Sequence, residues 1–198
     1  FAMNSNLRTI GEHAFSNNKI TQISIPSNVS TICDYAFFDC KQLSTVKISP
    51  NSNLRTIGKN AFYNTNITQF FIPLSLTELK EEWCREANEL TKITVSESND
   101  RFLFKDDKYL LGKSDTKSED FDILLFARRD IEEAEIPSNI KIISSYAFNN
   151  CKQLSKVEFA SNSNLRTIGE YAFSYTNITE ISIPSSLTEL KEGWCCGA

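Results

Sequence analysis

Apolar residues recur along the chain in a short alternating pattern. In ITQISIPSN, the residues Ile20, Ile23 and Ile25 are followed by Asn28, so apolar residues occupy positions 1, 4 and 6 and a polar residue occupies position 9. The pattern returns as LSTVKISPN, ITQFFIPLS, LTKITVSES, IEEAEIPSN, LSKVEFASN and ITEISIPSS. Apolar residues that alternate with polar ones predict a short β-strand with one buried face. Several copies continue with proline, which ends the strand because it has no amide to donate.

A second phrase precedes several of these strands. It reads NLRTIGEHAF from residue 6, NLRTIGKNAF from 53 and NLRTIGEYAF from 164. In the middle copy the apolar residues Leu54, Ile57, Ala61 and Phe62 are spaced by 3, 4 and 1, which favours a turn followed by a short helical segment. A unit this short cannot bury its apolar residues alone, so the phrase recurs because its copies stack on one another.

The chain is therefore a series of repeats with one insertion. Successive units begin 22, 25, 22, 64, 25 and 22 residues apart, at Leu7, Val29, Leu54, Leu76, Ile140, Leu165 and Leu187. We expect one continuous solenoid domain with repeats over 1–98 and 131–198, the last unit being incomplete, and an insertion over 99–130. Within the insertion, the runs RFLF, KYLL and FDILLFA predict a small antiparallel β-hairpin flap.

Charge and hydropathy exclude two classes of partner. The net charge is −4, which argues against a nucleic-acid partner because such a partner is expected to meet a basic face. No apolar run approaches the roughly 20 residues that span a bilayer, so we expect no membrane span in this chain.

The sequence offers little catalytic chemistry. The lone His13 occupies a variable position of the repeat, and no nucleophile, phosphate or metal motif is present. We interpret the acidic residues of the insertion as a solvated charge run rather than a calcium loop; they are Asp106, Asp107, Asp115, Glu119, Asp120 and Asp122. Repeat-equivalent cysteines such as Cys40 and Cys151 favour core thiols over disulfides or a zinc site. The prediction is a protein that is not an enzyme and carries no cofactor and no metal.

The combined pattern resembles a known family. Apolar residues at 1, 4 and 6 with asparagine at 9, in a period of 22 to 25 residues, are typical of leucine-rich repeats. The segments TICDYAFFDCKQLSTVKI and IISSYAFNNCKQLSKVEF resemble the BspA-like branch of that family nearly throughout, although Cys33 replaces its usual glycine. The resemblance implies an α/β repeat solenoid, a horseshoe or superhelix with parallel strands on its concave face and short helical or irregular segments on its convex face. It also implies a part of a surface protein of bacteria or protists that acts in adhesion.

Function in such a fold would lie on the outward-facing residues of the strands. We predict a protein-binding concave face formed by Gln22, Ser24, Thr45, Lys47, Gln69, Phe71, Lys92, Thr94, Glu133, Glu135, Lys156, Glu158, Glu180 and Ser182. Phe71 is the candidate anchor, because it is an aromatic residue where other copies are polar. Glutamates dominate the carboxyl-terminal part of the face, which favours a basic partner.

The compartment and the assembly state stay open. Sequons at Asn28, Asn66 and Asn177 would accept glycans in a secreted protein, and the resemblance implies a cell-surface or secreted location. We therefore predict a non-catalytic interaction module that binds a host, neighbouring-cell or identical protein. The alternative is a cytoplasmic structural scaffold that self-assembles through its solenoid ends. Both ends interrupt the repeat pattern, so we expect either a fragment of a longer protein or ends that pair with another molecule.

Overall fold

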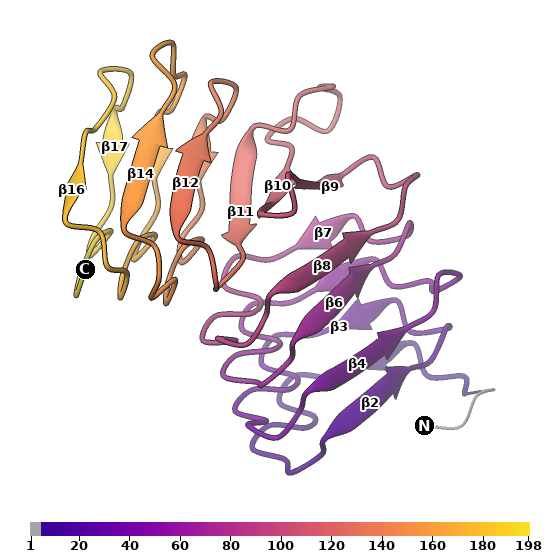
Figure 1. Cartoon of the computed structure of the whole chain (residues 1–198). Coiled ribbons are helices and arrows are strands. Elements are labelled where there is room, and N and C mark those ends of the chain that lie inside the picture. The colour runs from indigo at the N-terminus through magenta and orange to yellow at the C-terminus, as the bar shows by residue number, and fades with distance from the viewer. Residues whose placement is uncertain (1–4) are drawn as a thin grey trace. The chain divides into compact units, whose positions relative to one another are not determined.

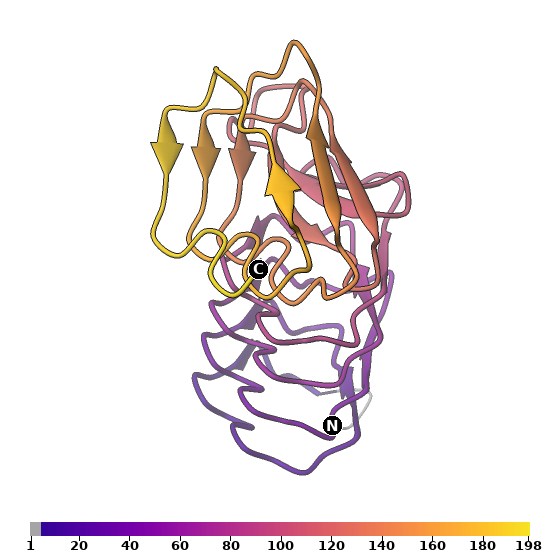
Figure 2. The same cartoon turned by 60° about the vertical axis from the view of Figure 1, so that its left-hand side comes forward.

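The computed structural model describes residues 5–198, and the chain divides into two compact units, 1–100 and 101–198. Each unit is a stack of short coils in which every coil contributes strands on two sides (Figures 1 and 2). The expected parallel-strand solenoid of stacked coils is therefore confirmed.

Over its described residues, 5–100, unit 1 contains eight strands in parallel pairings. Two-residue strands form one sheet in the order β1-β3-β5-β7. Four-residue strands pair as β2 with β4 and as β6 with β8, and these four lie side by side in Figure 1. The bounds are β1 Thr9–Ile10, β2 Gln22–Ile25, β3 Thr31–Ile32, β4 Thr45–Ile48, β5 Thr56–Ile57, β6 Gln69–Ile72, β7 Glu78–Leu79 and β8 Lys92–Val95.

Unit 2 repeats this arrangement and adds three strands at its start. Its two sheets run in the orders β17-β15-β13-β11-β10-β9 and β12-β14-β16. Strands β9, β10 and β11 are antiparallel to one another, whereas β11 is parallel to β13 and so joins the coil ladder. The bounds are β9 Phe102–Lys105, β10 Tyr109–Gly112, β11 Ile123–Ala127, β12 Glu133–Ile136, β13 Ile142–Ile143, β14 Lys156–Phe159, β15 Thr167–Ile168, β16 Glu180–Ile181 and β17 Glu189–Leu190.

The core consists of repeat residues stacked on their own copies. Phe37 stacks on Phe15 and on Phe62 with ring centroids 5.1 Å apart in both cases, and Phe148 stacks on Phe173 at 4.7 Å. Phe37, Phe62, Phe148 and Phe173 are fully buried. Stacked aromatic rings of this kind add favourable free energy beyond the burial of their area. The repeated phrase is thus maintained by packing between coils.

The expected helical segments, and with them the α/β class, are wrong, because residues 5–198 contain strands and turns but no helix. In the first copy, the amides of Ala14 and Ser16 donate to carbonyls three residues back, while the amide of Phe15 donates to Ala36 of the next coil at 2.8 Å. An α-helix requires each amide to bond four residues back along the same segment. Here alternate amides bond between coils, so the segment is a run of turns.

Left-handed residues enforce these turns. His13 and Asn17 have φ of 54° and 58°, and the same spacing of four recurs in the later coils. Residues other than glycine adopt this conformation at a cost of about 1 kcal/mol or more, and it interrupts a right-handed helix. Apolar spacing alone could not reveal it, because none of these first-coil positions is glycine.

The glycine of the repeated phrase has a packing role. A Cβ atom on Gly58 would lie 2.4 Å from the main-chain nitrogen of Asp34, and one on Gly169 would lie 2.4 Å from that of Ser145. Both contacts are to the backbone of the preceding coil, which cannot move aside as a side chain can. The absence of a side chain at these two glycines therefore allows neighbouring coils to approach this closely.

Asparagine links coils through its side chain. The Nδ2 amides of Asn28 and Asn139, both at position 9 of the strand pattern, donate to the carbonyls of Ser5 and Phe121 at 3.0 and 2.8 Å. Buried Asn99 donates in the same way to Pro73 and Leu76. Such bonds give main-chain oxygens of the turns a side-chain donor from a neighbouring coil.

Candidate functional site

The outward-facing residues of unit 1 form two ordered columns. Parallel register places Gln22 beside Thr45 and Gln69 beside Lys92, and the second column places Ser24 beside Lys47. The residues between them, such as Ile23 and Ile25, are buried, so each strand presents alternate side chains to the outside. We call the set Gln22, Ser24, Thr45, Lys47, Gln69, Phe71, Lys92 and Thr94 the unit 1 strand face.

Phe71 lies within the second column of the unit 1 strand face. Its register partner is Thr94 on β8, and its side chain is half-buried between exposed neighbours in this column. By contrast, Phe70 on the same strand is buried and packs against Trp83 at 4.9 Å. Phe71 is therefore an aromatic surface residue, and the structural core uses its neighbour.

Unit 2 carries the acidic part of the predicted face. Register aligns Glu133 with Lys156 and Glu180, and Glu135 with Glu158, while the exposed Ser182 follows β16. We call Glu133, Glu135, Lys156, Glu158, Glu180 and Ser182 the unit 2 strand face. Lys156 Nζ pairs with Glu158 Oε1 at 2.8 Å, and this hydrogen-bonded charge raises the pKa of Lys156, with further contributions from Glu133 and Glu135.

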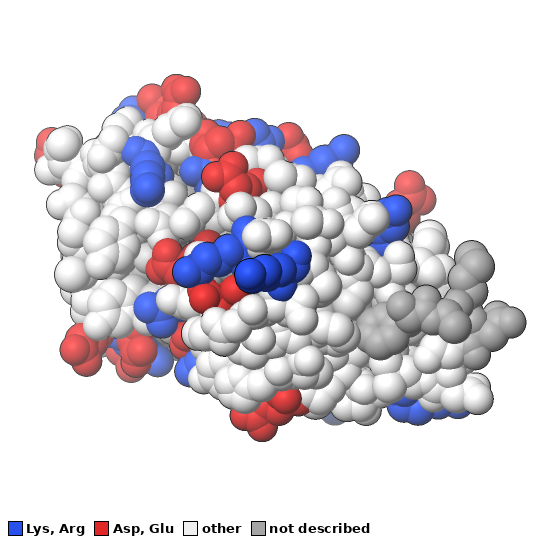
Figure 3. All heavy atoms as spheres, turned by 90° about the horizontal axis from the view of Figure 1, so that it is seen from below, with Lys and Arg blue, Asp and Glu red and all other residues white. Residues whose placement is uncertain are grey.

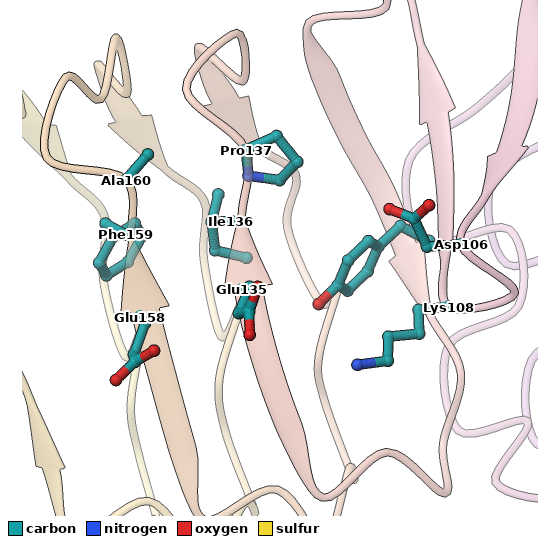
Figure 4. A pocket seen from close by; sticks show the side chains of 9 residues that line it. Asp106, Lys108, Glu135, Ile136, Pro137, Glu158, Phe159 and Ala160 are labelled. Atoms are coloured by element: carbon teal, nitrogen blue, oxygen red, sulfur yellow. The ribbon is translucent and has the colours of Figure 1, made fainter.

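A pocket of about 460 Å³ lies beside the unit 2 strand face (Figure 4). One wall comes from the β9–β10 turn and the start of β10, and the other from the ends of β12 and β14. The lining residues are Asp106, Lys108, Tyr109, Glu135, Ile136, Pro137, Glu158, Phe159 and Ala160. Three carboxylates and one lysine therefore meet an apolar wall in a single hollow.

Tyr109 is the buried polar residue of this pocket. Only 2% of its surface is exposed, and its hydroxyl has no hydrogen-bond partner among residues 5–198. Tyr109 at the start of β10 lines the pocket together with Glu135 of β12. Burial raises the pKa of Tyr109 to about 12, a shift that the nearby main chain of Glu135 opposes to a smaller degree. The hydroxyl is thus protonated at neutral pH.

The sequence had not pointed to this pocket. Tyr109 lies in the run KYLL and Phe159 in a strand repeat, so both have the pattern of core residues. Asp106 was included in the acidic run interpreted as solvated, and that interpretation is wrong for Asp122. Asp122 is 1% exposed, accepts hydrogen bonds from Ser114 and pairs with Lys141 Nζ at 3.0 Å. Burial would raise the pKa of Asp122, but these partners together outweigh it and lower the pKa.

Cysteine and histidine form no metal or disulfide site within residues 5–198. Cys40, Cys84 and Cys151 are buried, which confirms core thiols at these three positions, whereas Cys196 is exposed. His13 is exposed and stacks on Tyr35 with ring centroids 4.9 Å apart. The geometry of these groups is that of packing and surface residues.

The three sequons differ in their surroundings. Asn66 and Asn177 are exposed. Asn28 is half-buried, and its Nδ2, the atom to which a glycan would be joined, is already engaged with the Ser5 carbonyl. Only the first two therefore present an unobstructed acceptor.

The surface shows no broad field of one charge on the face drawn in Figure 3, where Lys and Arg alternate with Asp and Glu. Within residues 5–198 no helix is long and apolar enough to cross a bilayer.

Comparison with known proteins agrees with this geometry. The model of the BspA type leucine-rich repeat region matches six copies over residues 1–106 and 121–195. No curated protein sequence matches the chain.

Solved structures share the fold. A crystal structure of the pneumococcal vaccine antigen PcpA is 29% identical with a TM-score of 0.86, over 94% of this chain and 45% of that chain. A leucine-rich cell surface protein from Faecalibacterium prausnitzii is 23% identical with a TM-score of 0.80, over 98% of this chain and 55% of that chain. The chain thus spans about half the length of these two proteins. Repeat residues, stacked coils and the match to the family model lead to one conclusion: the chain belongs to the BspA-type leucine-rich repeat family.

Proposed function

We propose that the chain is a non-catalytic protein-binding module of a cell-surface or secreted protein, and that its two strand faces contact the partner. The observation that carries the proposal is the alternation along the long strands. Inward residues such as Ile23 and Val46 are buried repeat residues, whereas their outward neighbours differ from coil to coil and remain aligned. A constant backbone that presents a variable row of side chains is the arrangement with which repeat proteins bind extended surfaces.

The surface location is supported by the proteins that share the fold. One is a vaccine antigen and another is named a cell surface protein. The test is antibody labelling of the native full-length protein on intact and on permeabilised cells. Labelling of intact cells supports the proposal, whereas labelling only after permeabilisation would favour the cytoplasmic scaffold.

The contribution of Phe71 can be tested separately. Once a partner has been identified by crosslinking on intact cells, Phe71→Glu should weaken its binding by about 30-fold or more, as expected for an aromatic anchor worth about 2 kcal/mol. Because Phe71 is only half-buried, the thermal melt followed by circular dichroism should change little.

Leu74→Glu is the matched control. Leu74 is 53% exposed and lies in the turn after β6, outside the columns, so the same change of charge there should leave binding intact. Equal binding by both variants and the original chain would remove Phe71 from the contact surface.

A further inference from the structure

We infer that the pocket between the β9–β10 turn and the ends of β12 and β14 is a subsite for an arginine side chain of the protein partner. The inference rests on the proposed function and adds the chemistry of one contact. Its volume of about 460 Å³ is in the range of roughly 300–1,000 Å³ that is usual for ligand pockets. Every lining residue belongs to unit 2.

The charges of the pocket select a cation. Asp106, Glu135 and Glu158 line it against the single Lys108. Glu158 is already paired with Lys156, but Glu135 has no ion-pair partner among residues 5–198. A phosphate or carboxylate ligand would be repelled by these groups, whereas a cation would gain from the unpaired carboxylate.

The buried hydroxyl of Tyr109 offers a hydrogen-bond acceptor at the same place. A buried polar atom without a partner costs free energy that a ligand recovers by bonding to it. Tyr109 of β10 and Glu135 of β12 line the same hollow from its two walls. A guanidinium group has five N–H donors in a planar fork, so one group can donate to the phenol oxygen and to the carboxylate together.

The apolar wall suits the remainder of an arginine side chain. Ile136, Pro137 and Phe159 line the hollow on the side of β12 and β14. Methylene groups pack on such surfaces while the charged end stays at polar atoms, and a guanidinium plane also stacks on an aromatic ring. Lysine would make fewer of these contacts because its ammonium neither forks nor stacks.

A hollow on the strand face of unit 1 lacks these features. Its hollow is lined by Phe15, Ile20, Gln22, Ile23, Ser24 and Lys47, which include no carboxylate. The two units thus share their coils but differ in the charge of the hollow beside them. A cation is expected to bind in unit 2 and to avoid the hollow of unit 1.

The test uses the whole chain labelled with ¹⁵N and an acetylated, amidated Gly-Arg-Gly peptide as the probe. We expect saturable shifts of the amide signals of Tyr109 and Glu135 that weaken as salt is added. The same peptide with citrulline in place of arginine keeps the shape and loses the charge, and it should cause no saturable shift. Glu135→Gln and Tyr109→Phe should each weaken binding about tenfold.

Glu119→Gln is the control, because Glu119 is an exposed carboxylate outside the pocket, and it should bind the peptide as the original chain does. Shifts that never saturate, equal binding of the citrulline peptide, or unchanged affinity of Glu135→Gln would overturn the inference. The proposed function, in which Phe71 contacts the protein partner, would not be affected by these results. Conversely, peptide binding at the pocket in a chain that captures no protein would refute the proposed function and leave the cation site.

Discussion

Units 1 and 2 bury the same repeat residues, but the rings that pack against the phenylalanine of one coil differ. The two residues to compare are Phe37 in unit 1 and Phe148 in unit 2. In unit 1, Phe37 stacks between Phe15 and Phe62, both copies of itself. In unit 2, Phe148 stacks on Phe173, but its other aromatic neighbour is Tyr109 of β10, in an edge-on contact at 6.1 Å. A strand outside the repeat pattern thus takes the place of a repeat coil.

That difference shows that the β9–β11 segment is part of the core of unit 2. Strand β11 continues the ladder of β13, β15 and β17, and Tyr109 covers Phe148. The β9–β11 segment fills the place of a repeat coil only in part. On the side of β12 a hollow lined by Tyr109 remains. The same replacement that completes the core therefore creates the candidate binding pocket.

The largest expected effect tests whether the two cores are equivalent. Phe37→Ala and Phe148→Ala each remove a fully buried ring and should each lower the free energy of unfolding by about 3–5 kcal/mol. Urea denaturation, monitored by hydrogen exchange of peptides from each unit, would measure the loss of unfolding free energy in the unit where it occurs. A much smaller loss for Phe148→Ala would show that Tyr109 supports the coil without the Phe148 ring. The two cores would then not be equivalent.

A smaller effect tests the spacing of coils in both units. Gly58→Ala and Gly169→Ala force a Cβ against the backbone of the preceding coil, at 2.4 Å in each case, and should cost about 2–3 kcal/mol. Gly11 is the control, because nothing lies within 4 Å of a Cβ placed there. Gly11→Ala should leave the urea midpoint unchanged or slightly raised. Equal midpoints for all three variants would contradict the close approach.

The smallest effect should be confined to unit 2. Asp122→Asn weakens the hydrogen bonds to Ser114 and the pair with Lys141, and should cost roughly 1–2 kcal/mol at pH 7. Because the folded pKa of Asp122 is lowered, its charge stabilises the fold above the ordinary value of 3.8, and this stabilisation is lost as pH falls through the folded pKa.

The original chain and Asp122→Asn should therefore converge in acid, as measured by urea midpoints over a pH series. In unit 1, Lys80 lowers the pKa of Glu78 through an exposed pair. Solvent screening makes such a pair worth little, so Glu78→Gln should shift the midpoints far less. A constant difference between the original chain and Asp122→Asn at every pH would refute the role of the charge.

The repeat sequence was sufficient to predict the stacked coils and the strand registers. Apolar residues at positions 4 and 6 recur in every copy, and parallel pairing of similar strands leaves one register that puts them all on the same face. It was not sufficient for the segment between strands, since the spacing of Ala14 and Phe15 suits a helix as well as a run of turns. The choice depends on amides that bond to the next coil, which a single repeat does not contain.

The sequence by itself determined the family, the coil period and the columns of outward side chains, because each follows from contacts that repeat at a fixed spacing. Only the tertiary structure decided that Asp122 is buried, that Tyr109 takes the place of a repeat phenylalanine and that Tyr109 and Glu135 line the same hollow. The physical reason is that these contacts join the unique insertion to the repeats. They occur once, so no periodic pattern encodes them.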